Sequence, residues 1–222
     1  MKRNYQRELD GILEQIPQGT VPSLLLHSCC APCSSYVLEY LSRYFRITVF
    51  YYNPNIHPEE EYRRRLEEQR RLIKEMPLFH AAAFVGGEFE SGRFYEAVRG
   101  VEQIPEGGER CFRCYELRLR KAAEKAAQLG MDYFTTTLTI SPLKNAEKLN
   151  EIGLRLGREM GVPYLVSDFK KRDGYKRSIE LSAEYGLYRQ NYCGCAFSKR
   201  EAAEREQRAE CRKSQIETKE RN

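Results

Sequence analysis

Short apolar runs alternate along the chain with longer amphipathic stretches. The short runs are rich in residues that favour strands, whereas the longer stretches place apolar residues at helical spacing. The predicted strands are 23–27, 47–52, a weaker run near 78–84, 132–137 and 162–166. The predicted helices are 36–41, 58–75, 112–129, 144–160 and 175–186. Strands that alternate with helices predict an α/β fold: a mostly parallel sheet of about five strands flanked by helices.

The two ends of the chain carry a different pattern. Residues 1–20 predict an amphipathic helix that Pro17 ends, and residues 200–222 form a polar tail. We therefore expect one α/β domain over 1–222, with a helical extension at 1–20 and the tail at 200–222. The longest apolar runs hold about five residues, too few for a membrane span. The charged opening also lacks the apolar core of a secretory signal, so we expect a cytoplasmic protein without a membrane partner.

Seven of the eight cysteines fall into three tight clusters. The metal-ligand candidates are Cys29, Cys30, Cys33, Cys111, Cys114, Cys193 and Cys195, whereas Cys211 stands alone in the tail. Thiolates that are two or three residues apart can bind one metal ion or one cluster together. The first cluster follows a predicted strand directly, and sites in α/β sheets form beyond the carboxyl ends of the strands. We therefore expect the three segments to converge on a metal site at that edge.

Several kinds of cysteine chemistry compete at this point. A disulfide framework belongs mostly to secreted or very small proteins, and 222 residues with 41% apolar content can build a core without one. The Cys30-Ala31-Pro32-Cys33 sequence is also compatible with a thiol–disulfide oxidoreductase, although such a site needs no further thiols. One zinc ion would use four of the seven cysteines, as in a zinc-binding RNA module. An iron–sulfur cluster would use four and leave three for a second metal.

Charge and hydroxyl groups add candidate substrate contacts. The net charge is only +5, so its distribution matters more than its size. The run Arg63-Arg64-Arg65 alternates with glutamates and predicts a solvated helix face, whereas Lys170, Lys171 and Arg172 suit either solvent or phosphates. The hydroxyl-rich segment 135–145 can likewise be read as a strand and helix start, or as a phosphate grip. Its candidate contacts are Thr139, Ser141, Lys144 and Asn145. The three isolated histidines, His27, His57 and His80, are expected to be packed or on the surface.

Six segments together resemble the QueH-type epoxyqueuosine reductases. They are LLLHSCCAPCSS at 24–35, FYYNPNI at 50–56, ERCFRCY at 109–115, TTTLTISPLKN at 135–145, SDFKK at 167–171 and YRQNYCGC at 188–195. The resemblance runs from about residue 22 to 200 and leaves out the N-terminal helix and the tail. It implies a Rossmann-like, nucleotide-hydrolase-like fold. It also implies the final step of queuosine biosynthesis, in which epoxyqueuosine in the anticodon wobble position of tRNA is reduced to queuosine and water.

The resemblance further implies a 4Fe-4S cluster beside a mononuclear metal ion, with iron as the expected metal. It leaves open which four cysteines hold the cluster, although some relatives have Asp in place of Cys33, which points that residue toward the single metal. An external electron donor is required. Neither a Ser-Gly-Gly-x-Asp-Ser phosphate loop nor a cobalamin-binding sequence is evident, so we expect neither ATP nor cobalamin. Asp168 and Tyr192 are candidates, by location, for the acid that protonates the leaving oxygen.

Overall fold

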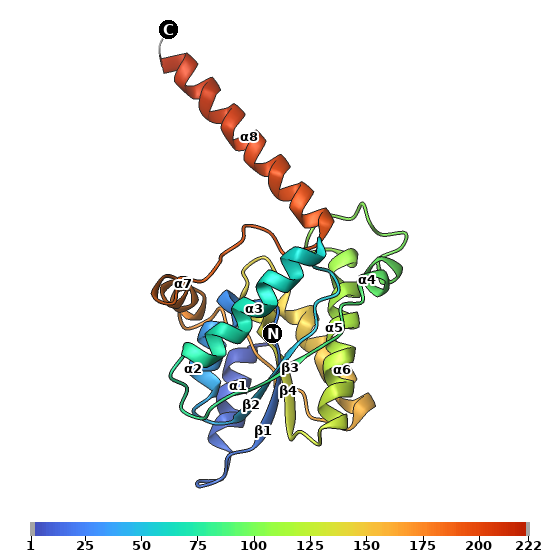
Figure 1. Ribbon diagram of the computed structural model, residues 1–222, viewed down its shortest axis with the longest axis vertical. Coiled ribbons are helices and arrows are strands. Elements are labelled where there is room, and N and C mark those ends of the chain that lie inside the picture. The colour runs from blue at the N-terminus through green and yellow to red at the C-terminus, as the bar shows by residue number, and fades with distance from the viewer. Residues whose placement is uncertain (1–2, 221–222) are drawn as a thin grey trace.

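A computed structural model describes residues 3–220 of the chain, with side chains described for residues 3–210 (Figure 1). The side chain of Cys211, which the sequence places in the tail, therefore lies outside the described residues. Among residues 3–220, no helix combines the length and apolar character that crossing a membrane requires.

The centre of the fold is a parallel sheet of four strands. In chain order they are β1 (Ser23–His27), β2 (Arg46–Tyr51), β3 (Ala83–Gly86) and β4 (Tyr133–Thr136). Their order across the sheet is β3-β2-β1-β4, so β1 lies inside and pairs with both β2 and β4. The predicted α/β class and parallel sheet are confirmed.

The prediction of about five strands is wrong, because the segment 162–166 does not complete a strand. It runs beside β4 and makes one isolated parallel bridge, between Phe134 and Tyr164. Pro163 has no backbone N–H to give to a ladder. Beyond the bridge, the side-chain amide of Asn150 forms hydrogen bonds with both the backbone N–H and the backbone C=O of Ser167, the residue that follows the segment. Side-chain bonds thus replace the ladder that a fifth strand would need.

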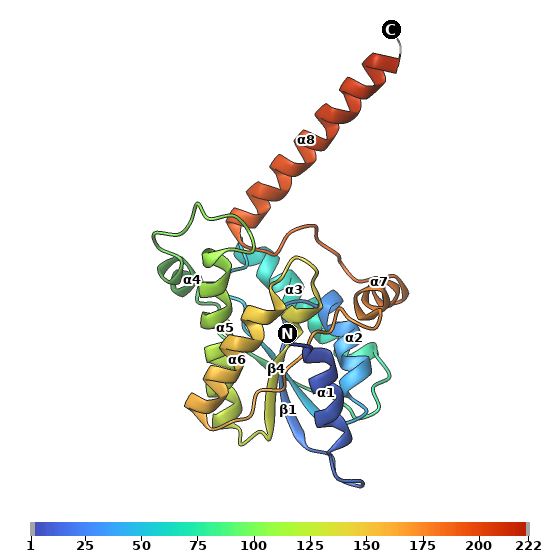
Figure 2. The same ribbon diagram turned by 180° about the vertical axis from the view of Figure 1, so that it is seen from behind.

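Helices cover both faces of the sheet. They are α1 (Tyr5–Glu14), α2 (Ala31–Leu41), α3 (Glu59–Glu75), α4 (Ser91–Ala97), α5 (Glu109–Gln128), α6 (Ala146–Met160), α7 (Gly174–Glu184) and α8 (Ala196–Glu220), with a short 3₁₀ turn η1 (Thr137–Ile140). Side chains of a strand point alternately to its two faces. Leu24 and Leu26 of β1 therefore pack with α1, α2, α3 and α7, whereas Leu25 packs with α5 and α6 (Figures 1 and 2).

The two ends of the chain behave differently. The N-terminal helix α1 buries Leu9 and Leu13 in the first of these cores. The helix α8 instead leaves the body and projects away from it (Figure 2). It begins directly after Cys195, so the last of the clustered cysteines stands at the base of this projection.

Candidate metal centre

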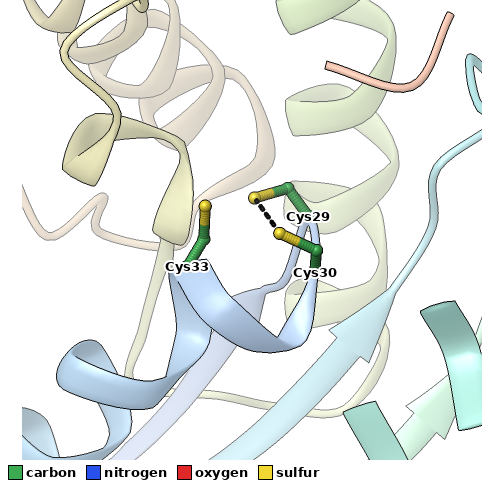
Figure 3. Close-up of side chains that lie close together, drawn as sticks. All are labelled: Cys29, Cys30 and Cys33. Atoms are coloured by element: carbon green, nitrogen blue, oxygen red, sulfur yellow. Dashed lines mark hydrogen bonds between the residues drawn. The ribbon is translucent and has the colours of Figure 1, made fainter. Parts of the chain in front are cut away.

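The first three cysteines converge at the carboxyl end of β1. Cys29 lies in the turn after the strand, Cys30 is the residue before α2, and Cys33 is in its first turn. Pro32 fits there because the first turn of a helix does not use its N–H groups within the helix. The three sulfur atoms lie within 4.8 Å of one another and point toward the same space (Figure 3). Metal–sulfur bonds of about 2.3 Å place two thiolates of one ion up to about 4.6 Å apart, so this trio matches a single ion.

The three thiols of the trio differ in the direction in which their pKa is shifted. The pKa of Cys30 lies well below its ordinary value, because Cys29 and Cys33 donate hydrogen bonds to its sulfur. The hydrogen bond to Cys30 raises the pKa of Cys29 to about 12, and the pKa of Cys33 is also raised by its two neighbours. A bound cation would displace the thiol protons that remain on the trio.

The other four clustered cysteines line a second, smaller cavity. Cys111 and Cys114 come from the start of α5, and Cys193 and Cys195 from the loop before α8. Among the residues that the structure describes, no three of these sulfurs approach within 4.8 Å as the trio does. Four thiols spaced around a cavity suit a cluster better than one ion.

Backbone N–H groups already point at the sulfurs of this quartet. Gly107 donates to the Sγ of Cys111 and Ser198 to the Sγ of Cys195, each at 3.3 Å. Such bonds stabilise anionic sulfur and tune iron–sulfur sites. Without a metal, burial raises the pKa of Cys114 to about 12, so this thiol favours its protonated form until a metal replaces the proton.

An open pocket of about 210 Å³ lies over the trio. Its wall includes all three trio cysteines, Cys193 and part of the hydroxyl-rich segment after β4. Tyr192 and Ser141, both predicted site residues, line this pocket. The Tyr192 ring lies 5.1 Å from the guanidinium of Arg65. Cys193 lines both this pocket and the small cavity, so the structure places the three cysteine segments around two adjoining spaces.

A larger groove of about 1,110 Å³ adjoins the pocket. One wall is the start of α1, and the other is the turn that carries Lys170, Lys171 and Arg172. Asp168 and Asn145 also line the groove rather than the thiol pocket, and Asp168 is ion-paired with Lys170. The groove and the pocket meet at residues 142–144, which border both.

Two of the predicted substrate contacts sit deeper than the surface. Lys144 borders the pocket, the groove and the cavity, and its ammonium forms a 2.9 Å ion pair with Glu106. Both side chains of this pair are nearly buried. Thr139 is fully buried and bonds the hydroxyl of Ser167 at 2.9 Å, so it ties η1 to the segment after 166 and lines neither the pocket nor the groove.

The structure also corrects the prediction for one arginine run. Arg63 and Arg64 are exposed as expected, but Arg65 is 2% exposed and donates to the backbone oxygen of Cys193 at 3.1 Å. Arg118 and Glu106 were missed altogether. Arg118 follows Cys114 by four residues on α5, a spacing that places both on one helix face. The sequence could therefore have indicated that Arg118 lies beside this cysteine. Glu106 lies in a loop, where no such spacing indicates its neighbours.

A parallel α/β sheet with seven free thiols at its carboxyl edge, beside an open pocket, defines an α/β protein with a cysteine-rich centre of the kind that binds metal. The family model of epoxyqueuosine reductase QueH matches residues 24–201, and the chain belongs to this family.

Curated relatives carry the same description. The chain is 43% identical over 200 residues to epoxyqueuosine reductase QueH of Streptococcus pyogenes, which covers 89% of this chain and 78% of the relative. It is 43% identical over 202 residues to the protein of that name from Staphylococcus epidermidis, with 89% and 85% covered. The relative from Thermotoga maritima is 36% identical over 190 residues, with 84% and 94% covered.

Proposed function

We propose that this protein reduces epoxyqueuosine in the anticodon wobble position of tRNA to queuosine, the final step of queuosine biosynthesis. The family membership supports the reaction. The observation that carries the proposal is the open pocket, because the three trio cysteines and Cys193 of the quartet all line it. We place the reaction in the cytoplasm, where tRNA and reductants that keep thiols free are found.

The overall chemistry sets what the site must provide. Conversion of the epoxide to an alkene consumes two electrons and two protons and releases the oxygen as water. The quartet Cys111, Cys114, Cys193 and Cys195 would hold a 4Fe-4S cluster, and the trio would hold one iron ion. When bound, these groups supply single-electron transfer from an external one-electron donor and Lewis-acid polarisation of the oxygen. The thiol donor set and the N–H groups aimed at its sulfurs fit such metals.

The chain's own residues would bind and orient the modified base. Ser141 and Tyr192 line the pocket, and Tyr192 is our candidate for protonating the leaving oxygen. Asp168, the other predicted acid, lies in the adjoining groove in contact with Lys170. A role for Asp168 would therefore be in holding the basic turn against the substrate rather than in the thiol pocket.

The groove offers a path for the rest of the anticodon loop. It is lined by more cationic than anionic side chains, and Arg7 and Lys171 have no ion-pair partner among the described residues. Phosphates bind to such surfaces and displace counterions. We infer that the sugar–phosphate backbone lies along the groove while the wobble base enters the pocket at residues 142–144.

The test combines metal analysis with turnover. Protein purified without oxygen is expected to contain iron and sulfide. With a one-electron reductant, it should convert epoxyqueuosine in tRNA to a nucleoside that has lost one oxygen atom by mass spectrometry. Zinc in place of iron, together with tRNA binding but no product, would instead identify a zinc-binding RNA module.

A further inference from the structure

Arg118 is a buried cation without a carboxylate partner. Its side chain, on α5, is 1% exposed. Its Nη2 atom donates a hydrogen bond to the amide oxygen of Asn53, whereas its Nε atom is buried without any hydrogen-bond partner among the described residues. Within that part of the chain, no carboxylate oxygen lies within 4.0 Å of it. A permanent charge taken out of water in this way is costly unless a negative charge balances it.

The groups that face Arg118 are thiols from both metal sets. Its Nη1 atom lies 4.0 Å from the sulfur of Cys114. Burial lowers the pKa of Arg118, but Cys114, Cys193 and Cys29 outweigh that effect and raise it overall. Asn53 also donates to the backbone oxygen of Ser28 at 2.9 Å, which ties the guanidinium to the turn that carries the trio.

Substrate cannot provide the missing negative charge. Arg118 lines the small cavity of the quartet. It does not line the open pocket or the groove, where a phosphate could enter. The balancing charge must therefore come from the thiols themselves in their ionised, metal-bound form.

We propose that Arg118 is the built-in counter-charge of the metal centre, stabilising the loaded thiolate site and favouring its reduction at the expense of the metal-free protein. Four thiolates around an iron–sulfur core leave a net negative charge, and reduction adds one more. A buried cation lowers the cost of both. The idea rests on the proposed function only for the identity of the metal, because any cation bound by these thiolates leaves the same excess of negative charge.

The first test uses protein without metal. Replacing Arg118 with Met keeps much of the side-chain volume and removes the charge, so we expect the melting temperature of the metal-free protein to rise. Arg110 provides the matched control, since it is also on α5 and 2% exposed but is paired with Glu201 at 2.8 Å. Arg110→Met leaves the carboxylate of Glu201 without its partner, so the melting temperature should fall. If Arg118→Met falls as well, or fails to fold, Arg118 is an ordinary structural residue and the proposal is wrong.

The second test uses protein loaded with iron and sulfide. During titration with dithionite, Arg118→Met should show a more negative midpoint potential than wild type and should lose iron to a chelator several-fold faster. Arg118→Lys, which keeps the charge, should recover most of both properties. An unchanged potential and an unchanged rate of iron loss in Arg118→Met would overturn the proposal.

Failure of the proposed reaction would be visible separately. A wild-type protein that holds the cluster but leaves epoxyqueuosine unchanged would contradict the proposed function. The midpoint potential and the rate of iron loss of the Arg118 variants would still test the role of the charge. If the protein binds zinc instead, the rate of zinc loss to a chelator replaces the potential, with the same order expected for wild type, Lys and Met.

Discussion

The seven clustered cysteines divide by the spacing of their sulfurs. The trio gathers within the span of one ion, and the quartet stands around a cavity. Cys33 and Cys114 can therefore be compared as members of different sites. This division does not depend on their position in the sequence, where both belong to C-x-x-C pairs.

Cys114→Ser is expected to remove most of the cluster absorbance and sulfide, because the quartet has no fifth thiol to replace it. Cys33→Ala should keep most of the sulfide, lose the extra iron and abolish turnover. Cys33→Asp is expected to regain part of the activity, since a carboxylate also binds iron. Iron and sulfide content of anaerobic protein, with turnover, measures all three. Equal loss of sulfide in the Cys33 and Cys114 variants would show that the cysteines form a single site.

The cysteines of this centre could be predicted from the sequence, whereas the burial of its charged residues could not. Cysteine clusters are local, so their spacing alone indicates a metal site. Whether an arginine is buried depends on segments that are far apart in the chain. Arg65 was expected in solvent because glutamates surround it in sequence, but in the fold Gly194 packs against its guanidinium. The pairing of Lys144 with Glu106 is equally non-local.

At the scale of elements, the basic turn before α7 is held in an unusual backbone conformation. Arg172 and Asp173 have positive φ angles of 51° and 60°. This conformation is energetically unfavourable for residues other than glycine, so contacts with the surrounding residues must stabilise it. Gly174, the next residue, is tightly packed. A Cβ atom there would lie 2.0 Å from the backbone oxygen of Phe169 and 2.4 Å from the ring of Tyr36.

Gly174→Ala should therefore displace the turn, destabilise the protein by about 1–3 kcal/mol and weaken tRNA binding. Gly11→Ala in α1 is the control, since a Cβ at that position meets nothing within 4 Å. It should stabilise the helix by about 0.5–1 kcal/mol. Thermal unfolding and tRNA binding by filter retention measure both effects. Unchanged binding in a destabilised Gly174 variant would show that the turn does not contact the substrate.

The opposite edge of the sheet offers a test of pH dependence. The carboxylate of Asp132, just before β4, accepts hydrogen bonds from the backbone N–H and hydroxyl of Ser23, both at 2.7 Å. The backbone bond and then the hydroxyl bond hold the pKa of Asp132 below its ordinary value. A depressed carboxyl pKa stabilises the fold above the unfolded pKa of about 3.9, and this stability is lost as the pH falls through the folded value.

Asp132→Asn should accordingly lower the melting temperature by about 1–2 °C at pH 7, a small effect because the carboxylate is exposed. The difference from wild type should vanish near pH 3. Turnover should not change, since the residue lies far from the thiols. Glu14→Gln, at an exposed acid without a hydrogen bond among the described side chains, should show no loss at either pH. A difference that grows on acidification would contradict the sign of the pKa shift.

The elements themselves were predictable where local pattern decides them. β1, β2, β4 and the helices α1, α3, α5, α6 and α7 follow apolar periodicity, whereas the helix α8 lies largely in the predicted polar tail. The short helix α4 and the turn η1 were not predicted, because each depends on the segments packed around it. The fifth strand failed for a related reason. Its composition suits a strand, but Asn150 of a neighbouring helix binds the backbone N–H and C=O of Ser167, the residue that directly follows it.

For the molecule as a whole, the order of the strands explains where the site lies. The chain proceeds from β1 to β2 and β3 on one side and then crosses to β4 on the other. Loops that follow β1 and β4 therefore part in opposite directions, and crevices for ligands open at such points. Cys29 follows β1 and Thr137 follows β4, and the Thr137 hydroxyl donates to the sulfur of Cys29 at 3.3 Å across this crevice.

The groove beside this crevice should make tRNA binding depend on salt. Changing Lys170, Lys171 and Arg172 together to Ala is expected to reduce the slope of log affinity against log salt by up to about 2, given about 0.7 for each phosphate contact. Arg63→Ala with Arg70→Ala, both exposed on α3 and paired with neighbouring glutamates, should leave the slope unchanged. An unchanged slope in the triple variant would make the turn ordinary solvated surface.

The long separation between the two thiol sets has a consequence for synthesis of the protein. About 160 residues lie between Cys33 and Cys193, and a ribosome adding about 5–20 residues per second needs about 8–32 s to make them. Throughout that interval the nascent chain carries the first three thiols without the loop that completes the centre. Oxygen and competing metals can reach them in this window. The supply of iron and the exclusion of oxygen during expression, rather than during purification, should therefore decide what fraction of the protein is correctly loaded.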